Sequence, residues 1–79
     1  MDLISTESFM KDTTLLDKPT KEVLRKKLLK IKENPEMSKP IGNNRFSERF
    51  EGYRIVFEIY SGKIYLLRVK KRDEVYRNI

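Results

Sequence analysis

The sequence predicts one small α+β domain in which two helices pack on one face of an antiparallel sheet. The first half of the chain carries apolar residues at the 3.6-residue helical period, and the second half carries three runs that alternate with the period of a strand. No internal repeat or low-complexity tract divides the chain. At 79 residues, it can bury one layer of helices on one sheet and little more. Residues 1–79 are therefore predicted to be a single domain.

A short strand and a first helix are predicted at the N-terminus. The opening DLIS, residues 2–5, is a brief apolar run, and either its last residue, Ser5, or the next residue, Thr6, is predicted to cap a helix. Apolar and small residues at helical spacing, Phe9, Thr13 and Leu16, extend this helix to about Leu16.

The second helix has the stronger pattern and is predicted over residues 20–33, with Asp17 or Thr20 as its cap. Its apolar stripe consists of Val23, Leu24, Leu28 and Ile31. Pro35 ends the helix because the residue before a proline is pushed out of the helical region. Residues 35–45 are expected to form an irregular connection.

Three strands are predicted in the second half, in RFSERF (45–50), YRIVFEIY (53–60) and KIYLLRVK (63–70). A two-residue turn at Glu51-Gly52 places Arg49 opposite Arg54 and Phe50 opposite Tyr53. Since cross-strand neighbours share a face, the two aromatic side chains point to the core and the two arginines point away from the helices.

The same alternation assigns the remaining strand residues to faces. The core face of the middle strand is Tyr53, Ile55, Phe57 and Ile59, and that of the last strand is expected to be Tyr65, Leu67 and Val69. This phase needs a three-residue turn, Ser61-Gly62-Lys63, because a two-residue turn would bury Arg68 at a cost in desolvation. The outer face then has an apolar end, formed by Val56, Tyr60, Ile64 and Leu66.

A row of basic side chains is the most unusual feature of the predicted outer face. It contains Arg49, Arg54, Arg68, Lys70 and Arg72. Like charges on neighbouring strands cost stability, so the arrangement needs a use, and arginine binds phosphate through two hydrogen bonds of fixed geometry. The alternative is a solvated face whose positive charge is incidental.

Composition narrows the possible chemistry. The net charge of +6 favours a polyanionic partner or an acidic protein. The chain contains no cysteine and no histidine, which excludes disulfides, argues against zinc, and removes the usual acid–base residue. No apolar run approaches the ~20 residues that cross a bilayer, and no signal peptide is recognisable. We expect a cytoplasmic protein without a membrane, metal or cofactor requirement.

The segments ENPEMSKPIGNN, GYRIVFEI and KIYLLRVKKRDEVY, in this order, resemble the RelE branch of the RelE/ParE toxin superfamily. The resemblance covers nearly the whole chain and implies a β-α-α-β-β-β microdomain. It also implies a toxin of a type II toxin–antitoxin pair, with a small acidic, RelB-like antitoxin as its partner. The implied activity is a metal-independent, ribosome-dependent mRNA endonuclease that cleaves in the A site by attack of the 2′-hydroxyl on the adjacent phosphate.

The resemblance also assigns site residues. It implies a catalytic set of Arg54, Arg72, Tyr76 and Arg49, with further RNA or phosphate contacts from Arg45, Arg68, Lys70 and Lys71. This chain departs from the family pattern where the best-known member has lysines on the strand before Gly-Tyr-Arg, because it has Arg45 and Ser47 there. It also has Lys71 where other members have a histidine.

These departures leave the general base open, with Tyr76 and Lys71 as candidates. Tyr76 could equally stack on an mRNA base or anchor the tail on the sheet. They also leave an alternative function open, namely a catalytically inactive binder of the same fold that inhibits gyrase or binds only its antitoxin or RNA. A basic RNA-binding domain unrelated to these toxins is the third reading.

Overall fold

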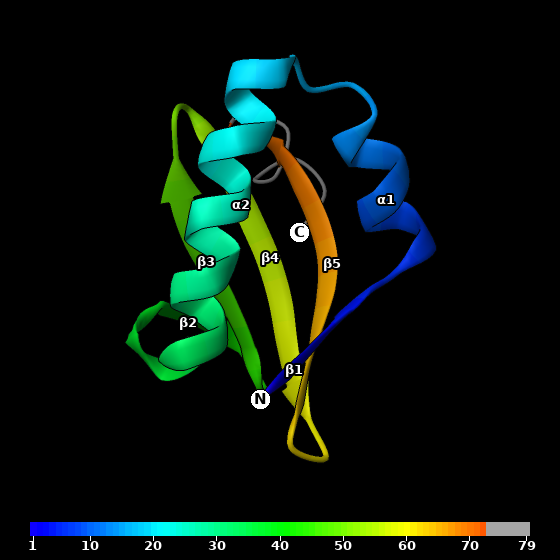
Figure 1. Ribbon diagram of the computed structural model, residues 1–79. Helices are drawn as coiled ribbons and strands as arrows, with labels where there is room; N and C mark the ends of the chain where they lie inside the picture. Colours follow the sequence, from blue (N-terminus) through cyan, green and yellow to red (C-terminus); the bar gives the residue numbers. More distant parts are fainter. Residues whose placement is uncertain (73–79) are drawn as a thin grey trace.

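The computed structural model describes residues 1–72, and it confirms the predicted α+β class (Figure 1). Its elements are β1 (Asp2–Ser5), α1 (Glu7–Thr13), α2 (Lys18–Glu33), the 3-10 turn η1 (Pro35–Met37), β2 (Lys39–Gly42), β3 (Arg45–Phe50), β4 (Tyr53–Tyr60) and β5 (Lys63–Lys71). Within the described range, the strands form one five-stranded sheet in the order β1-β5-β4-β3-β2. The sheet is mixed rather than wholly antiparallel, because β1 runs parallel to β5.

Side-chain caps begin both helices at the predicted places. The Thr6 hydroxyl accepts a hydrogen bond from the Phe9 N–H, and the Asp17 carboxylate accepts one from the Thr20 N–H. Helix α1 ends at Thr13, earlier than predicted, where the Thr13 and Thr14 hydroxyls donate back to carbonyls of the preceding turn. Of the helices in residues 1–72, none is both long enough and apolar enough to cross a membrane.

The connection predicted as irregular over residues 35–45 contains η1 and the additional strand β2. Strand β2 pairs antiparallel with β3, with Lys39 opposite Ser47 and Pro40 opposite Phe46. The segment gains regular structure because β3 otherwise presents unpaired backbone groups along its edge. Pro40 is compatible with this position because β2 lies at the edge of the sheet.

The first hairpin has the predicted register. Glu51 and Gly52 form a two-residue turn with φ of 46° and 78°, the left-handed conformation that such a turn requires. Arg49 therefore lies opposite Arg54, and Phe50 lies opposite Tyr53.

The second hairpin differs from the prediction. Tyr60 pairs with Lys63, so the turn has two residues, Ser61 and Gly62, rather than three. As a result Ile64 and Leu66, which were expected on the outer face, lie in the core with 0% and 1% of their surface exposed. Tyr65 faces away from them, and the predicted apolar patch at this end of the outer face does not exist.

A β-bulge in β5 then reverses which of its alternate side chains face the core. Phe57 lies opposite Leu66 and Val56 lies opposite Arg68, so Leu67 is the extra residue between two paired positions. Leu67 was predicted in the core and lies outside it, whereas Val69, also predicted there, is buried. The bulge returns Arg68 to the outer face. Arg68 stays out of the core as predicted, but a bulge rather than a longer turn keeps it there.

The core lies between the helices and the facing side of the sheet (Figure 1). Its buried members are Phe9, Leu16, Leu24, Ile31, Phe50, Ile55, Phe57, Ile64, Leu66 and Val69. Phe57 is at the centre with no exposed surface, and its ring stacks on that of Phe46 with 5.5 Å between the centroids.

Within residues 1–72, β5 has no strand partner on that side beyond the end of β1, and Asp12 supplies a hydrogen-bond acceptor to its backbone there. Its carboxylate is buried and accepts hydrogen bonds from the Val69 N–H at 3.0 Å and from Arg68 Nε and Nη2 at 2.8 and 3.1 Å. Burial alone would raise the pKa of Asp12. The hydrogen bonds from Arg68 and Val69, together with the positive charge of Arg68, outweigh it, so the pKa of Asp12 is lowered.

We expect Phe57→Ala to lower the free energy of unfolding by about 3–5 kcal/mol, because it removes a fully buried ring and leaves a cavity. Urea denaturation of the purified chain measures this change. Leu29→Ala is the matched control, since Leu29 is 55% exposed and its truncation should change stability by less than about 0.5 kcal/mol. If Phe57→Ala unfolded at the same urea concentration as wild type, the assignment of Phe57 to the core face of β4 would be wrong.

Asp12→Asn should lower the free energy of unfolding by about 1–3 kcal/mol near neutral pH, since it weakens hydrogen bonds to a buried carboxylate. Because the pKa of folded Asp12 is lowered, its contribution is full above the unfolded value of 3.8 and disappears as the pH falls through the lower folded value. The stability difference between wild type and variant should therefore be constant near neutral pH and shrink in acid.

Denaturation at a series of pH values checks this, with Glu7→Gln as the control. Glu7 belongs to the same helix and pairs with Lys11 at 3.4 Å, but its side chain is 81% exposed. Exposed pairs contribute little, so Glu7→Gln should show no such dependence. A wild-type to Asp12→Asn difference that stays constant down to pH 2 would contradict the role assigned to this carboxylate.

Candidate functional site

Basic side chains from three neighbouring strands form a row on the outer face of the sheet. Arg49 on β3 lies opposite Arg54 on β4, which lies opposite Lys70 on β5. Arg54 is buried, with 6% of its surface exposed, and its Nη1 donates a hydrogen bond to Ser47 Oγ at 2.9 Å. Ser47 therefore holds the guanidinium of Arg54 in one orientation.

This row borders a hollow of about 600 Å³ at the edge of the sheet, which we call the basic hollow. Its lining residues are Lys27, Lys39, Ser47, Glu48, Arg49, Arg54 and Arg72. They come from α2, β2, β3 and β4 and from the residue that follows β5. The basic hollow thus brings together three of the four residues predicted to be catalytic, Arg49, Arg54 and Arg72. The fourth, Tyr76, lies outside the described residues.

Two of the cations in the basic hollow were not predicted from the sequence. Lys27 Nζ donates to Glu48 Oε2 at 3.1 Å, and both side chains are 29% exposed. Lys27 lies on the apolar stripe of α2, three residues after Leu24 and four before Ile31, which was a usable signal. Lys39 was missed because its segment was expected to be irregular.

Two other predicted phosphate contacts are engaged in ion pairs elsewhere. Arg45 Nε donates to Glu58 Oε1 at 3.0 Å across β3 and β4. Arg68 forms the two-point contact with Asp12, and this hydrogen bonding raises the pKa of Arg68. The structure does not bring Arg45 or Arg68 into the lining of the basic hollow.

The two predicted lysines of β5 lie near the other edge of the sheet. Lys70 is half-buried beside Arg54, and Lys71 is exposed opposite Tyr53. Both line a separate hollow of about 240 Å³ between α1 and β5, which also includes Asp12.

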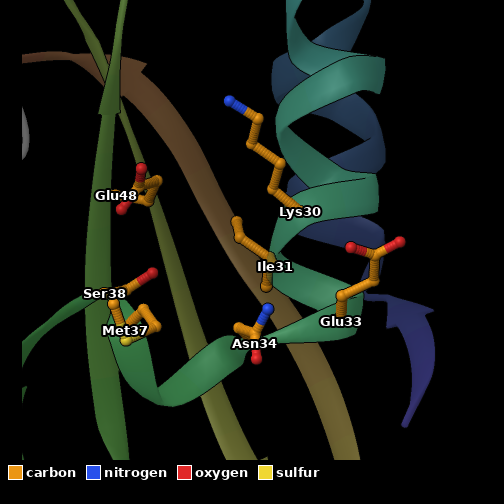
Figure 2. Close-up of a pocket in the computed structure, with 7 residues that line it drawn as sticks. All are labelled: Lys30, Ile31, Glu33, Asn34, Met37, Ser38 and Glu48. Atoms are coloured by element: carbon orange, nitrogen blue, oxygen red, sulfur yellow. The ribbon is translucent and has the colours of Figure 1, made fainter.

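A third hollow adjoins the basic hollow through Glu48. It has a volume of about 240 Å³ and lies between α2, η1 and β3 (Figure 2). Its lining residues are Lys30, Ile31, Glu33, Asn34, Met37, Ser38 and Glu48. In Figure 2, Lys30 and Ile31 extend from α2 toward the strand that carries Glu48. Glu48 is therefore a wall shared by two adjacent hollows.

The basic hollow is suited to a phosphodiester. Arginine donors in fixed positions form short, charge-assisted hydrogen bonds to phosphate oxygens, and partial burial strengthens them. In residues 1–72 no three His, Cys, Asp or Glu side chains come together in a group that could hold a metal ion.

Comparison with solved structures places this fold among known toxins. The intact RelBE toxin–antitoxin complex of E. coli contains a chain that is 26% identical, with a TM-score of 0.79, over 89% of this chain and 94% of that chain. A mutant of E. coli RelE in the free state is also 26% identical, with a TM-score of 0.80, over 96% and 90%. The RelB–RelE complex of Methanococcus jannaschii matches at 18% identity and a TM-score of 0.80, over 96% and 98%, which shows the fold alone.

No match was found among curated proteins. A family model, that of the ParE toxin of the type II toxin–antitoxin system parDE, matches residues 3–76. With the RelE structures, it confirms the resemblance seen in the sequence. The chain therefore belongs to the ParE toxin family of type II toxin–antitoxin systems and is a RelE-like member of the RelE/ParE superfamily.

Proposed function

We propose that this toxin is a ribosome-dependent mRNA endonuclease that acts in the cytoplasm, enters the ribosomal A site and cleaves the codon there. The observation that carries the proposal is the convergence of Arg49, Arg54 and Arg72 on one hollow, with Lys27 and Lys39 beside them. These arginines are the ones that the sequence resemblance implies for phosphate chemistry, and they come from β3, from β4 and from the residue that follows β5.

The reaction needs no external nucleophile, because RNA supplies its own 2′-hydroxyl. Attack of the 2′-oxygen on the adjacent phosphorus forms a pentacoordinate phosphorane, and departure of the 5′-oxygen leaves a 2′,3′-cyclic phosphate and a 5′-hydroxyl. Holding the 2′-oxygen in line with the leaving oxygen supplies part of the acceleration. Neutralising the charge that builds on the phosphorane supplies another part.

Arg54 is the residue best prepared for that neutralisation. It is buried, and its hydrogen bond to Ser47 fixes the guanidinium before any substrate arrives. Preorganised donors in a partly desolvated site stabilise a transition state without the cost of reorienting. Arg49 and Arg72 are exposed, so they can bind the phosphate from the solvent side.

A second candidate function is a non-catalytic binder, such as a gyrase inhibitor. The observation that favours it is the family model itself, which is that of ParE toxins. In addition, Ser47 is a neutral residue in the basic hollow at a position where the best-known RelE toxin has a lysine. The arginines of the hollow favour the ribonuclease.

The proposal includes a small acidic, RelB-like antitoxin as the partner. Two of the structures to which this chain is similar, RelBE of E. coli and RelB–RelE of M. jannaschii, are toxin–antitoxin complexes. A net charge of +6 favours an acidic partner. Exposed apolar side chains also give such a partner surface to bury, among them Met10, Leu15, Leu29, Met37 and Tyr60.

Arg72→Ala should slow single-turnover cleavage of mRNA on programmed ribosomes ~10²–10³-fold, because it removes a charged donor that is needed most in the transition state. The cleavage rates of Arg72→Lys and Arg54→Lys should lie between those of wild type and Arg72→Ala. Lysine keeps the positive charge but cannot donate two parallel hydrogen bonds as a guanidinium does.

Arg25→Ala is the matched control for the arginine variants. Arg25 is an exposed arginine on α2 that pairs with Glu22 and does not line the basic hollow, so its loss should leave cleavage unchanged. Equal rates for wild type, Arg72→Ala and Arg54→Lys would place the phosphate contacts elsewhere. A wild type that never cleaves on ribosomes but blocks gyrase supercoiling would establish the second candidate function instead.

Association with the antitoxin should be steered by charge. We expect the association rate of this chain with the protein encoded beside its gene to fall at least about tenfold between low and high salt, as screening shortens the reach of the +6 charge. Surface plasmon resonance at several salt concentrations measures this rate. A neighbouring protein that is not acidic, or that binds at a salt-independent rate, would contradict the proposed partner.

A further inference from the structure

We propose that Glu48 is the general base that takes the proton from the attacking 2′-hydroxyl. This inference rests on the proposed ribonuclease function and identifies a residue that the sequence resemblance does not supply. Among the described residues that line the basic hollow, Glu48 carries the one carboxylate. Its ion pair with Lys27 at 3.1 Å offsets the repulsion that this carboxylate would exert on a phosphate in the hollow.

The backbone places Glu48 where it can reach the phosphate site. Alternation along β3 puts Ser47 and Arg49 on the outer face, whereas Glu48 points toward α2. Lys39, the first residue of β2, lies opposite Ser47, so strand pairing on this edge of β3 ends just before Glu48. The edge is open at that point, and the basic hollow extends around it from the outer face to Glu48.

The carboxylate is held in position with a free acceptor. Lys27 donates to Oε2 of Glu48 at 3.1 Å, and within residues 1–72 this carboxylate accepts no other side-chain hydrogen bond. Oε1 can therefore accept the proton of a ribose hydroxyl. With 29% of its side chain exposed, Glu48 is reachable from the hollow while its rotation is restricted by Lys27.

The other candidates for the base fit the geometry less well. Lys71 is exposed and belongs to the hollow at the far edge of the sheet, beside Asp12. Tyr76 lies outside the described residues. Glu48, in contrast, lines both the basic hollow and the adjacent hollow of Figure 2.

The 2′-hydroxyl gives its proton to Oε1 of Glu48 as its oxygen forms a bond to phosphorus, and the bond from phosphorus to the 5′-oxygen breaks. The 5′-oxygen leaves with that electron pair and takes a proton from water. Glu48 then returns its proton to the solvent, so the enzyme is regenerated. General base catalysis of this kind contributes about 10²–10⁴-fold.

The primary test is single-turnover cleavage on programmed ribosomes by Glu48→Gln, which keeps the shape and the hydrogen bond to Lys27 but cannot accept a proton. We expect a loss of about 10²–10⁴-fold. Glu58→Gln is the matched control, since Glu58 is also a β-strand carboxylate in an ion pair, 31% exposed, and does not line the basic hollow. It should cleave at the wild-type rate, and urea denaturation should show all variants folded.

Two further measurements separate a base from other roles. With an mRNA that carries sulfur in place of the 5′-bridging oxygen, the leaving group needs no protonation, so a base variant stays defective and an acid variant recovers. We expect Glu48→Gln to stay defective. Lys27→Met removes the tie between α2 and β3, which Glu48→Gln keeps, but leaves the carboxylate in place. The loss of cleavage in Lys27→Met should therefore be smaller than that in Glu48→Gln.

Recovery of Glu48→Gln on the sulfur substrate, an equal loss in Lys27→Met, or a wild-type rate in Glu48→Gln would each overturn the assignment of Glu48 and leave the ribonuclease function standing. If the wild type itself does not cleave on ribosomes, the proposed function fails and the assignment of Glu48 fails with it.

Discussion

The position of one extra residue in β5 governs the rest of the structure. Without the bulge at Leu67, a strand that buries Ile64 and Leu66 would bury Arg68 as well and turn Val69 outward. The bulge lets all three apolar residues enter the core and keeps Arg68 and Lys70 on the outer face. The core and the basic row thus depend on the same irregularity, which costs one unpaired position in the longest ladder of the sheet.

Two of the arginines on the outer face form ion pairs within the domain. Arg45 is paired with Glu58 and Arg68 with Asp12. Between them, the row of Arg49, Arg54 and Lys70 places like charges opposite one another, an arrangement that costs stability. A fold selected for stability alone would distribute these charges differently, so the row fits a site where stability was exchanged for binding.

Much of this architecture could be predicted because it depends on local rules. The apolar stripe of α2 and the turn at Glu51-Gly52 have clear sequence signals, and the predictions made from both are confirmed. The second turn was not, because Ser61-Gly62-Lys63 permits two loop lengths and the sequence carries no signal for a bulge. Strand β2 depends on the free edge of β3, a tertiary partner that local propensity does not include.

The candidate site was predictable only in part for a related reason. The alternation of side chains along the strands correctly predicted that Arg49 and Arg54 lie opposite each other on one face of the sheet. Arg45 and Arg68 form ion pairs with Glu58 and Asp12 and do not line the hollow. Such pairs depend on which carboxylates lie nearby in the folded chain, which the strand pattern does not reveal. Lys27, Lys39 and Glu48 entered the hollow from α2, β2 and the helix-facing side of β3, so a prediction based on one face of one sheet could not include them.

The short length of β2 explains why the hollow reaches both faces of the sheet. If β2 extended one or two residues toward its N-terminus, it would pair with Glu48 and Arg49 and close this edge of β3. The 3-10 turn at Pro35–Met37 prevents that extension, because its residues are fixed by the end of α2. The carboxylate that faces the helix and the arginines that face away from it can then meet around the open edge. A closed edge would leave a basic face on one side and a buried ion pair on the other, with no shared space between them.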